Sequence, residues 1–208
     1  MELFLRGMLI GFSIAAPVGP IGVLCIRRTL ADGLVVGLLT GLGAASADAV
    51  YAAIAGYGLT VVTAFLVGQQ TWIRLVGGLF LIYLGLRTFT ATPSNQAVQA
   101  NSGNLLRAYT STFFLTITNP ITILSFVAIF AGLGLGSVEN DMISATVIVL
   151  GVFLGSAIWW LFLSGGVSLF RERISFGVMG WVNRISGIII LGFGIGALLS
   201  SIQGFGLA

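Results

Sequence analysis

The sequence contains no histidine and no lysine, and its single cysteine is Cys25. One thiol cannot form an internal disulfide, and a chain without histidine lacks the usual ligand sets of zinc and haem centres. The sequence also has no Walker motif, no nucleophile elbow and no cluster of metal ligands. We therefore expect no enzymatic activity, no metal ion and no cofactor.

Charged residues are scarce as well, at 7% of the 208 residues, whereas hydrophobic residues make up 57%. A soluble domain carries about 25% charged residues. Almost the whole chain must therefore lie in lipid, and the net charge of +3 is not a nucleic-acid signal. We interpret the first apolar segment as a retained helix rather than a cleaved signal peptide, because no small-residue cleavage site follows it.

Short polar interruptions divide the chain into six apolar segments, each close to or above the roughly 20 residues that one helix needs to cross a bilayer. These segments cover residues 7–26, 33–65, 72–89, 108–135, 143–170 and 182–202. The sequence therefore predicts an all-α membrane protein with six transmembrane helices.

The two halves of the chain resemble each other. Residues 16–21 in the first segment (Ala-Pro-Val-Gly-Pro-Ile) correspond to residues 117–121 in the fourth (Ile-Thr-Asn-Pro-Ile), and 74–77 in the third correspond to 184–187 in the sixth. A duplicated unit of three helices inserts its second copy upside down, which gives the 3+3 inverted repeat typical of secondary transporters. The predicted units are the first repeat at 1–90, a polar linker at 91–107 and the inverted second repeat at 108–208.

The arginines are distributed unevenly across the predicted membrane. Seven belong to the side of the loops that follow the first, third and fifth segments, and two belong to the opposite side. Cytoplasmic loops carry the excess of basic residues. We therefore predict a multi-pass protein of the cell inner (plasma) membrane with both termini outside.

Two of the six predicted helices contain proline. Pro17 and Pro20 lie in the first and Pro120 lies in the fourth, and each removes a backbone donor from the helix. Gly19-Pro20 and Asn119-Pro120 also read as a helix cap followed by proline at the first helical position. We predict that helices one and four are broken, with positive half-helix ends that attract an anionic group at mid-membrane. A simple proline kink is the alternative.

Asp48 is the one acidic residue deep inside a predicted span, and alanines surround it in the sequence. Placing a carboxylate there costs about 2.5–3.5 kcal/mol on insertion scales, so such a group usually faces a cavity or a partner. Its candidate roles are binding a substrate ammonium group or carrying a coupling proton, and the alternative is a structural ion pair or cap. Tyr51 shares its helix face and is a candidate to hold the carboxylate or the substrate.

Three motifs resemble those of the lysine-exporter (LysE/RhtB-type) family of amino-acid exporters. The segment 11–20, Gly-Phe-Ser-Ile-Ala-Ala-Pro-Val-Gly-Pro, is similar to the opening motif of that family. The glycine-rich second segment with Asp48 and Tyr51 looks like its next block, and Thr118-Asn119-Pro120 resembles its mid-chain motif. The resemblance implies export of amino acids or close derivatives from the cytoplasm, driven by the proton gradient.

The alternative function is export of a metal cation by a related inverted-repeat protein. Hard cations prefer several oxygen ligands that include carboxylates, and one intramembrane acid fits that preference poorly. The expected partners are a small amino-acid substrate and the lipid bilayer, with a homodimer as one open assembly, and no nucleic acid.

Overall fold

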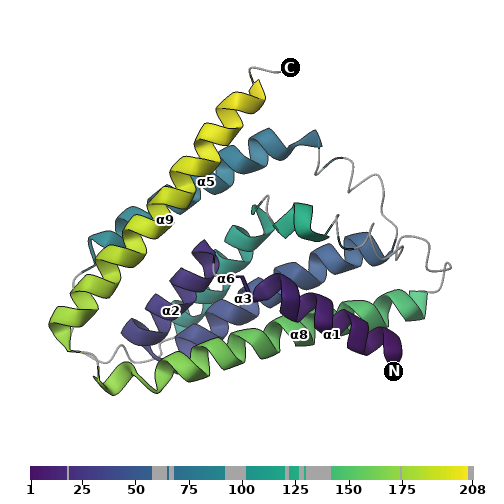
Figure 1. The fold of residues 1–208 in the computed structure, drawn as a ribbon, viewed down its shortest axis with the longest axis horizontal. Helices are drawn as coiled ribbons and strands as arrows, with labels where there is room; N and C mark the ends of the chain where they lie inside the picture. Colours follow the sequence, from purple (N-terminus) through teal and green to yellow (C-terminus); the bar gives the residue numbers. More distant parts are fainter. Residues whose placement is uncertain are drawn as a thin grey trace.

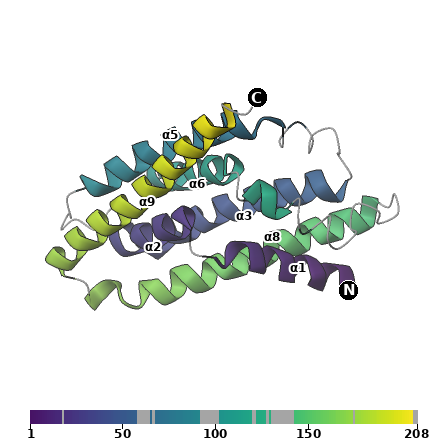
Figure 2. The same cartoon turned by 45° about the horizontal axis from the view of Figure 1, so that its top comes forward.

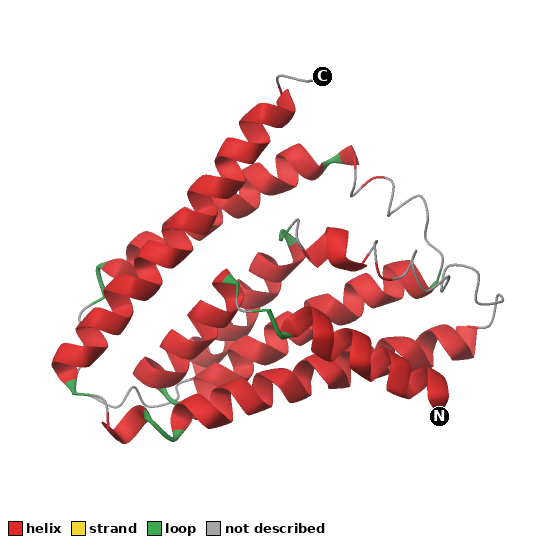
Figure 3. Ribbon diagram, viewed as in Figure 1, coloured by secondary structure: helices red, strands yellow, loops and turns green. Residues whose placement is uncertain are grey.

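The regular elements that the computed structural model describes are all helices (Figure 3). The described residues are 1–17, 19–57, 65, 68–91, 102–119, 122–126, 129, 142–173 and 175–205. Four of the helices are each long and apolar enough to cross a membrane, and a bent pair makes a fifth candidate. The expectation of an all-α membrane protein is therefore confirmed.

The bent pair consists of α1 (Glu2–Ala15) and α2 (Pro20–Asp32), which meet at an angle of 81°. The backbone of α1 ends with a bond from the Ala16 N–H to the Phe12 carbonyl at 3.0 Å. Gly19 is extended (φ −103°, ψ −164°), and Pro20 then begins α2. Proline is suited to this first position because the N–H group that it lacks would have no partner within the first turn of a helix.

A single residue, Gly33, joins α2 to α3 (Leu34–Gly56). Its φ of +100° lies in the region that glycine occupies without steric cost, so the chain can reverse direction in one step. The remaining helices are α5 (Gln70–Phe89), α6 (Ser102–Ile117), α8 (Met142–Ser168), the short 3₁₀ helix η2 (Arg171–Arg173) and α9 (Phe176–Phe205).

The predicted fourth span corresponds to α6, which begins within the predicted linker and ends at Ile117. The backbone is helical again at 122–126, so the chain departs from one continuous helix near the Asn-Pro motif. Pro120 itself, the rest of this span beyond residue 129 and the first part of the linker lie outside the described residues.

The helices pack in a small number of extended pairs. α1 lies along α8, α3 lies along both α6 and α8, and α5 lies along α9 (Figures 1 and 2). α2 contacts α3, α8 and α9, and so connects the α5–α9 pair with the other helices. In Figure 1 the N-terminus lies at the lower right and the end of α9 lies at the top, both away from the end of α8 at the lower left.

Glycines allow α1 and α8 to approach backbone to backbone. An added Cβ at Gly7 would lie 3.1 Å from the Cα of Gly151, and one at Gly11 would lie 2.8 Å from the Cα of Val152. Small residues at a spacing of four are the usual basis for close helix contact in membranes. The buried crossing of α3 and α8 beside this contact positions the candidate site.

Candidate functional site

A cavity of about 220 Å³ lies where α2 begins, α3 and α8 cross, and α6 ends. The side chains around it are mostly apolar, with a few polar groups that converge on one space, which is the usual character of a small-molecule site. We call it the central cavity, and it is lined by Ile14, Ala15, Pro17, Gly19, Pro20, Ile21, Gly22, Ala44, Asp48, Thr116, Asn119, Thr122, Ser125, Trp160 and Phe193.

Asp48 is the one carboxylate among these lining residues. Its side chain is 3% exposed, and its Oδ2 accepts a hydrogen bond of 2.7 Å from the Ser156 hydroxyl of α8. The Trp160 indole N–H donates in turn to the Ser156 oxygen at 3.2 Å. This chain of donors holds the carboxyl group in one orientation but supplies no cation to balance a negative charge.

The broken helices contribute to the same cavity. Pro17, Gly19 and Pro20 line it from the junction of α1 and α2, and Asn119 lines it from the end of α6. The N-cap residue of α2 is Gly19, which has no side chain to cap the helix, and the positive end of the α2 dipole lies at the cavity wall. The cavity therefore combines a carboxyl group with a helix end that favours an anion.

Tyr51 is buried but is not among the residues that line the central cavity. Its hydroxyl donates to the carbonyl oxygen of Ile117, the last residue of α6, and its ring packs on Phe126 at 5.7 Å between centroids. The proton of this hydroxyl is directed to the freed carbonyl of a helix end, and a contact of Tyr51 with the substrate stays a prediction. Tyr51 thus positions the end of α6 on α3.

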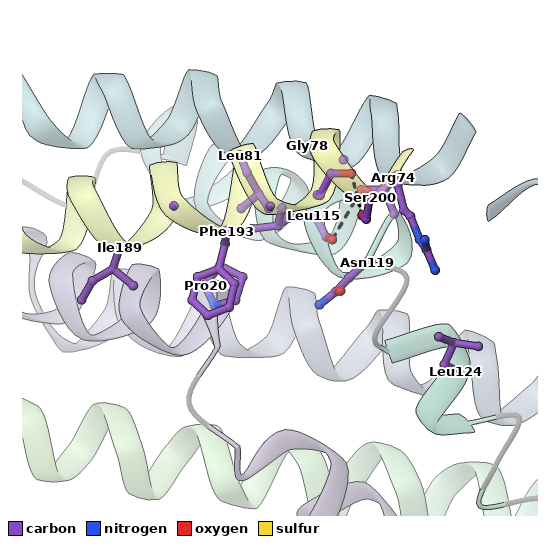
Figure 4. A pocket seen from close by; sticks show the side chains of 15 residues that line it. Pro20, Arg74, Gly78, Leu81, Leu115, Asn119, Leu124, Ile189, Phe193 and Ser200 are labelled. Carbon is purple, nitrogen blue, oxygen red and sulfur yellow. Dashed lines mark hydrogen bonds between the residues drawn. The ribbon is translucent and has the colours of Figure 1, made fainter. Parts of the chain in front are cut away.

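A larger cavity of about 610 Å³ adjoins the central one and shares Pro20, Asn119 and Phe193 with it. It lies between the α5–α9 pair and the end of α6, with Arg74 and Ser200 far from Pro20 in the view of Figure 4. Glycines of α5 and α9 form part of its walls, namely Gly77, Gly78, Gly192 and Gly196. Together the two cavities extend from Asp48 toward the end of the molecule where α5 begins and α9 ends.

Several residues of the site carry no clear signal in the sequence. Ser156, Trp160 and Phe193 are ordinary residues of apolar helices, and only the folded packing brings them to Asp48. Thr116 lies next to the Asn-Pro motif and could have been found by its proximity to that motif. The structure brings Asp48, Pro17, Gly19, Pro20 and Asn119 together at one cavity.

Long apolar helices, a broken helix pair and a buried carboxyl beside an internal cavity indicate a multi-pass membrane protein. Residues 12–201 match the family model described as LysE type translocator. The chain belongs to this family of membrane transporters, as its motifs indicate.

Three curated relatives align over most of their own length. The chain is 27% identical over 198 residues to "Putative amino acid efflux protein YcgF" of Bacillus subtilis, which covers 93% of this chain and 94% of the relative. It is 31% identical to the uncharacterized membrane protein YahN of Escherichia coli over 79% of this chain and 75% of the relative. It is also 31% identical to the uncharacterized membrane protein YrhP of Bacillus subtilis over 86% of this chain and 90% of the relative. No solved structure matches the chain.

Proposed function

We propose that this protein is a secondary transporter that exports amino acids or close derivatives from the cytoplasm and couples export to the proton gradient. The observation that carries the proposal is the meeting of Asp48 and the N-terminus of α2 at one cavity. A zwitterion has an ammonium group for the first and a carboxylate for the second. The family and the efflux description of one relative are consistent with this substrate class.

The arrangement of the helices supports an inverted 3+3 repeat. If the α1–α2 pair is the counterpart of α6, α3 of α8 and α5 of α9, exchange of the halves turns the α1–α8 pair into the α6–α3 pair. The same exchange maps the α3–α8 pair and the α5–α9 pair onto themselves. A two-fold relation of this kind is the architecture from which alternating access proceeds in many secondary transporters.

The direct test uses proteoliposomes loaded with a mixture of amino acids and common metal ions. Under an imposed proton gradient, we expect amino acids to leave the vesicles and metal ions to remain. Efflux of a divalent cation without any amino acid would instead support the alternative of metal export. That alternative fits less well, because the central cavity has one carboxylate and hard cations prefer several oxygen ligands that include carboxylates.

The orientation follows from the arginine excess, and we expect both termini on the outer side of the membrane. A reporter enzyme that is active only in the periplasm should be active when attached after Ala208. It should be inactive when inserted at Ser94 in the linker, outside the described residues. The reverse pattern would show that the chain is inserted the other way up.

Replacing Pro20 by Ala should reduce export while membrane insertion stays intact. Pro20 begins α2 and lines both cavities, so an added backbone N–H at this point changes where the helix begins. A displacement of about 1 Å in a binding group can cost about 100-fold in rate, and we expect a loss on the order of 10-fold. The measurement is export per inserted molecule.

Two further proline substitutions accompany this change, one as a second test and one as its matched control. Pro120→Ala should act like Pro20→Ala, whereas Pro93→Ala in the predicted linker should leave export unchanged. Normal transport by the double variant Pro20→Ala, Pro120→Ala would show that these prolines are ordinary kinks.

A further inference from the structure

A third cavity, of about 740 Å³ and with a polar lining, lies at the other side of the molecule from Ser200, where α2 and α5 end and α6 begins. Four arginines line it, and Asp32 is the one carboxylate among its lining residues. We call this space the arginine vestibule, and its basic residues are Arg27, Arg28, Arg87 and Arg107.

Arg28 is a fixed and buried cation in the vestibule, with 9% of its surface exposed. Its Nη1 donates to the Ala108 carbonyl at 3.1 Å and to the Thr112 hydroxyl at 2.9 Å, and its Nη2 donates to the Ser111 hydroxyl at 2.8 Å. All of these acceptors are neutral. The hydrogen bonds therefore hold the guanidinium in place without cancelling its charge.

Among the described residues, no arginine of the vestibule forms an ion pair at contact distance, and Asp32 acts on Arg27 and Arg28 electrostatically from farther away. The Arg27 Nε donates to the amide oxygen of Asn183 at 3.0 Å, again a neutral acceptor. The sequence of the linker between α5 and α6 contains no Asp or Glu that could balance them. Four arginines against one carboxylate leave the vestibule with an excess of positive charge. A concave surface with such an excess concentrates ions of the opposite sign and can raise their association rate by about 10- to 1000-fold.

One buried apolar cluster borders both the vestibule and the central cavity. Leu24 and Leu84 line the vestibule, Ile21 and Trp160 line the central cavity, and all four belong to one buried hydrophobic cluster. This cluster is therefore apolar packing that a solute would meet between the vestibule and Asp48. Since the arginine-rich side is the proposed cytoplasmic side, the vestibule is placed where an exported solute would enter.

We propose that the arginine vestibule is an entry site that binds the carboxylate of the exported solute, and that the substrates are amino acids with zero or negative net charge. This inference rests on the proposed export of amino acids. A second cationic group, such as the side chain of lysine, would be repelled by the four arginines. It would also find no second carboxylate in the central cavity, where Asp48 is the one acid.

The test compares efflux of glutamate, leucine and lysine from proteoliposomes made of the zwitterionic lipid phosphatidylcholine. We expect glutamate and leucine to be exported at least about 10-fold faster than lysine, within the range expected for electrostatic focusing. The double variant Arg87→Gln, Arg107→Gln should raise the KM for glutamate about 10-fold with little change in kcat, because it weakens capture and not the later steps.

The matched control is Arg184→Gln, which removes one positive charge from the same side of the membrane but outside the vestibule. Arg184 is exposed and lies over the Trp181 ring, with its guanidinium carbon 6.0 Å from the ring centroid. This variant should keep the wild-type KM. Preferential export of lysine, or an unchanged KM in the Arg87→Gln, Arg107→Gln variant, would overturn the proposal.

Two further measurements have separate purposes. The first distinguishes a lipid headgroup from a solute carboxylate as the anion bound in the vestibule, and the second distinguishes failure of the vestibule proposal from failure of the proposed export function. If the arginine variants change KM only in vesicles that contain phosphatidylglycerol, the vestibule binds lipid headgroups and the entry-site proposal is wrong. Thermal stabilisation of the detergent-solubilised protein by glutamate but not lysine, lost in the double variant, would support the vestibule without any transport. Absence of that stabilisation would overturn the vestibule, whereas absence of export for every amino acid would overturn the proposed function alone.

Discussion

Replacing Asp48 by Asn should abolish net export and leave the fold intact. The amide oxygen of Asn can still accept the hydrogen bond from the Ser156 hydroxyl, so the α3–α8 crossing keeps its polar contact. The amide cannot ionise, and it can neither pair with an ammonium group nor carry a proton. Loss of one positioned proton-transfer group typically costs about 100-fold or more, and we expect export in proteoliposomes to fall by at least that factor.

Two measurements make this prediction decisive. Asp48→Glu should retain part of the export with an altered pH dependence, because the carboxyl is kept but displaced. Substrate binding to Asp48→Asn, measured on a stabilised form of the protein, separates the two roles: weak binding indicates an ammonium contact, and normal binding without export indicates proton transfer. Unchanged export and an unchanged pH profile in Asp48→Asn would show that the carboxylate is structural.

Replacing Gly155 by Ala should lower the free energy of unfolding, although the change adds only one methyl group. An added Cβ at this position would lie 2.7 Å from the carbonyl carbon of Met8 and 2.8 Å from its Cα. These are backbone atoms, so relief requires α1 to move away from α8. Overpacking of this kind costs about 1–3 kcal/mol, which for a chain of this size lowers the melting temperature by about 2–4 °C per kcal/mol.

Gly166→Ala in the same helix is the matched control. An added Cβ at Gly166 meets nothing within 4 Å, and alanine is about 1 kcal/mol more favourable than glycine in a helix. We expect this variant to be as stable as the wild type or slightly more so. Equal melting temperatures for Gly155→Ala and Gly166→Ala would show that the α1–α8 contact is looser than the structure has it.

The sequence predicts the helical membrane class and the break in the first helix because both depend on local chemistry. Apolar length identifies the long membrane helices, four of which the structure shows with a bent pair as a fifth candidate, and Gly19-Pro20 marks where α2 begins. The cost of a lone carboxylate in lipid also singles out Asp48 without any knowledge of its neighbours.

The partners of Asp48 could not be predicted in the same way. Ser156 is 108 residues away in the sequence, and a serine in an apolar helix has no local signal for its contact. Tyr51 shows a related limit of prediction from the sequence. The helical period places Tyr51 on the same face as Asp48, but in the packed structure its hydroxyl donates to the carbonyl oxygen of Ile117 in α6. Periodicity gives the face of a helix, whereas only tertiary packing decides which neighbour meets it.

The hydrogen bond between Asp48 and Ser156 joins α3 and α8, the two helices that would change places under the proposed inverted repeat. The point where two such helices cross lies near the axis that relates the halves, and in an inverted repeat this axis runs within the membrane plane. A group on that axis keeps its depth when the halves exchange conformations. One carboxyl group would then be presented to each side of the membrane in turn without travelling between them.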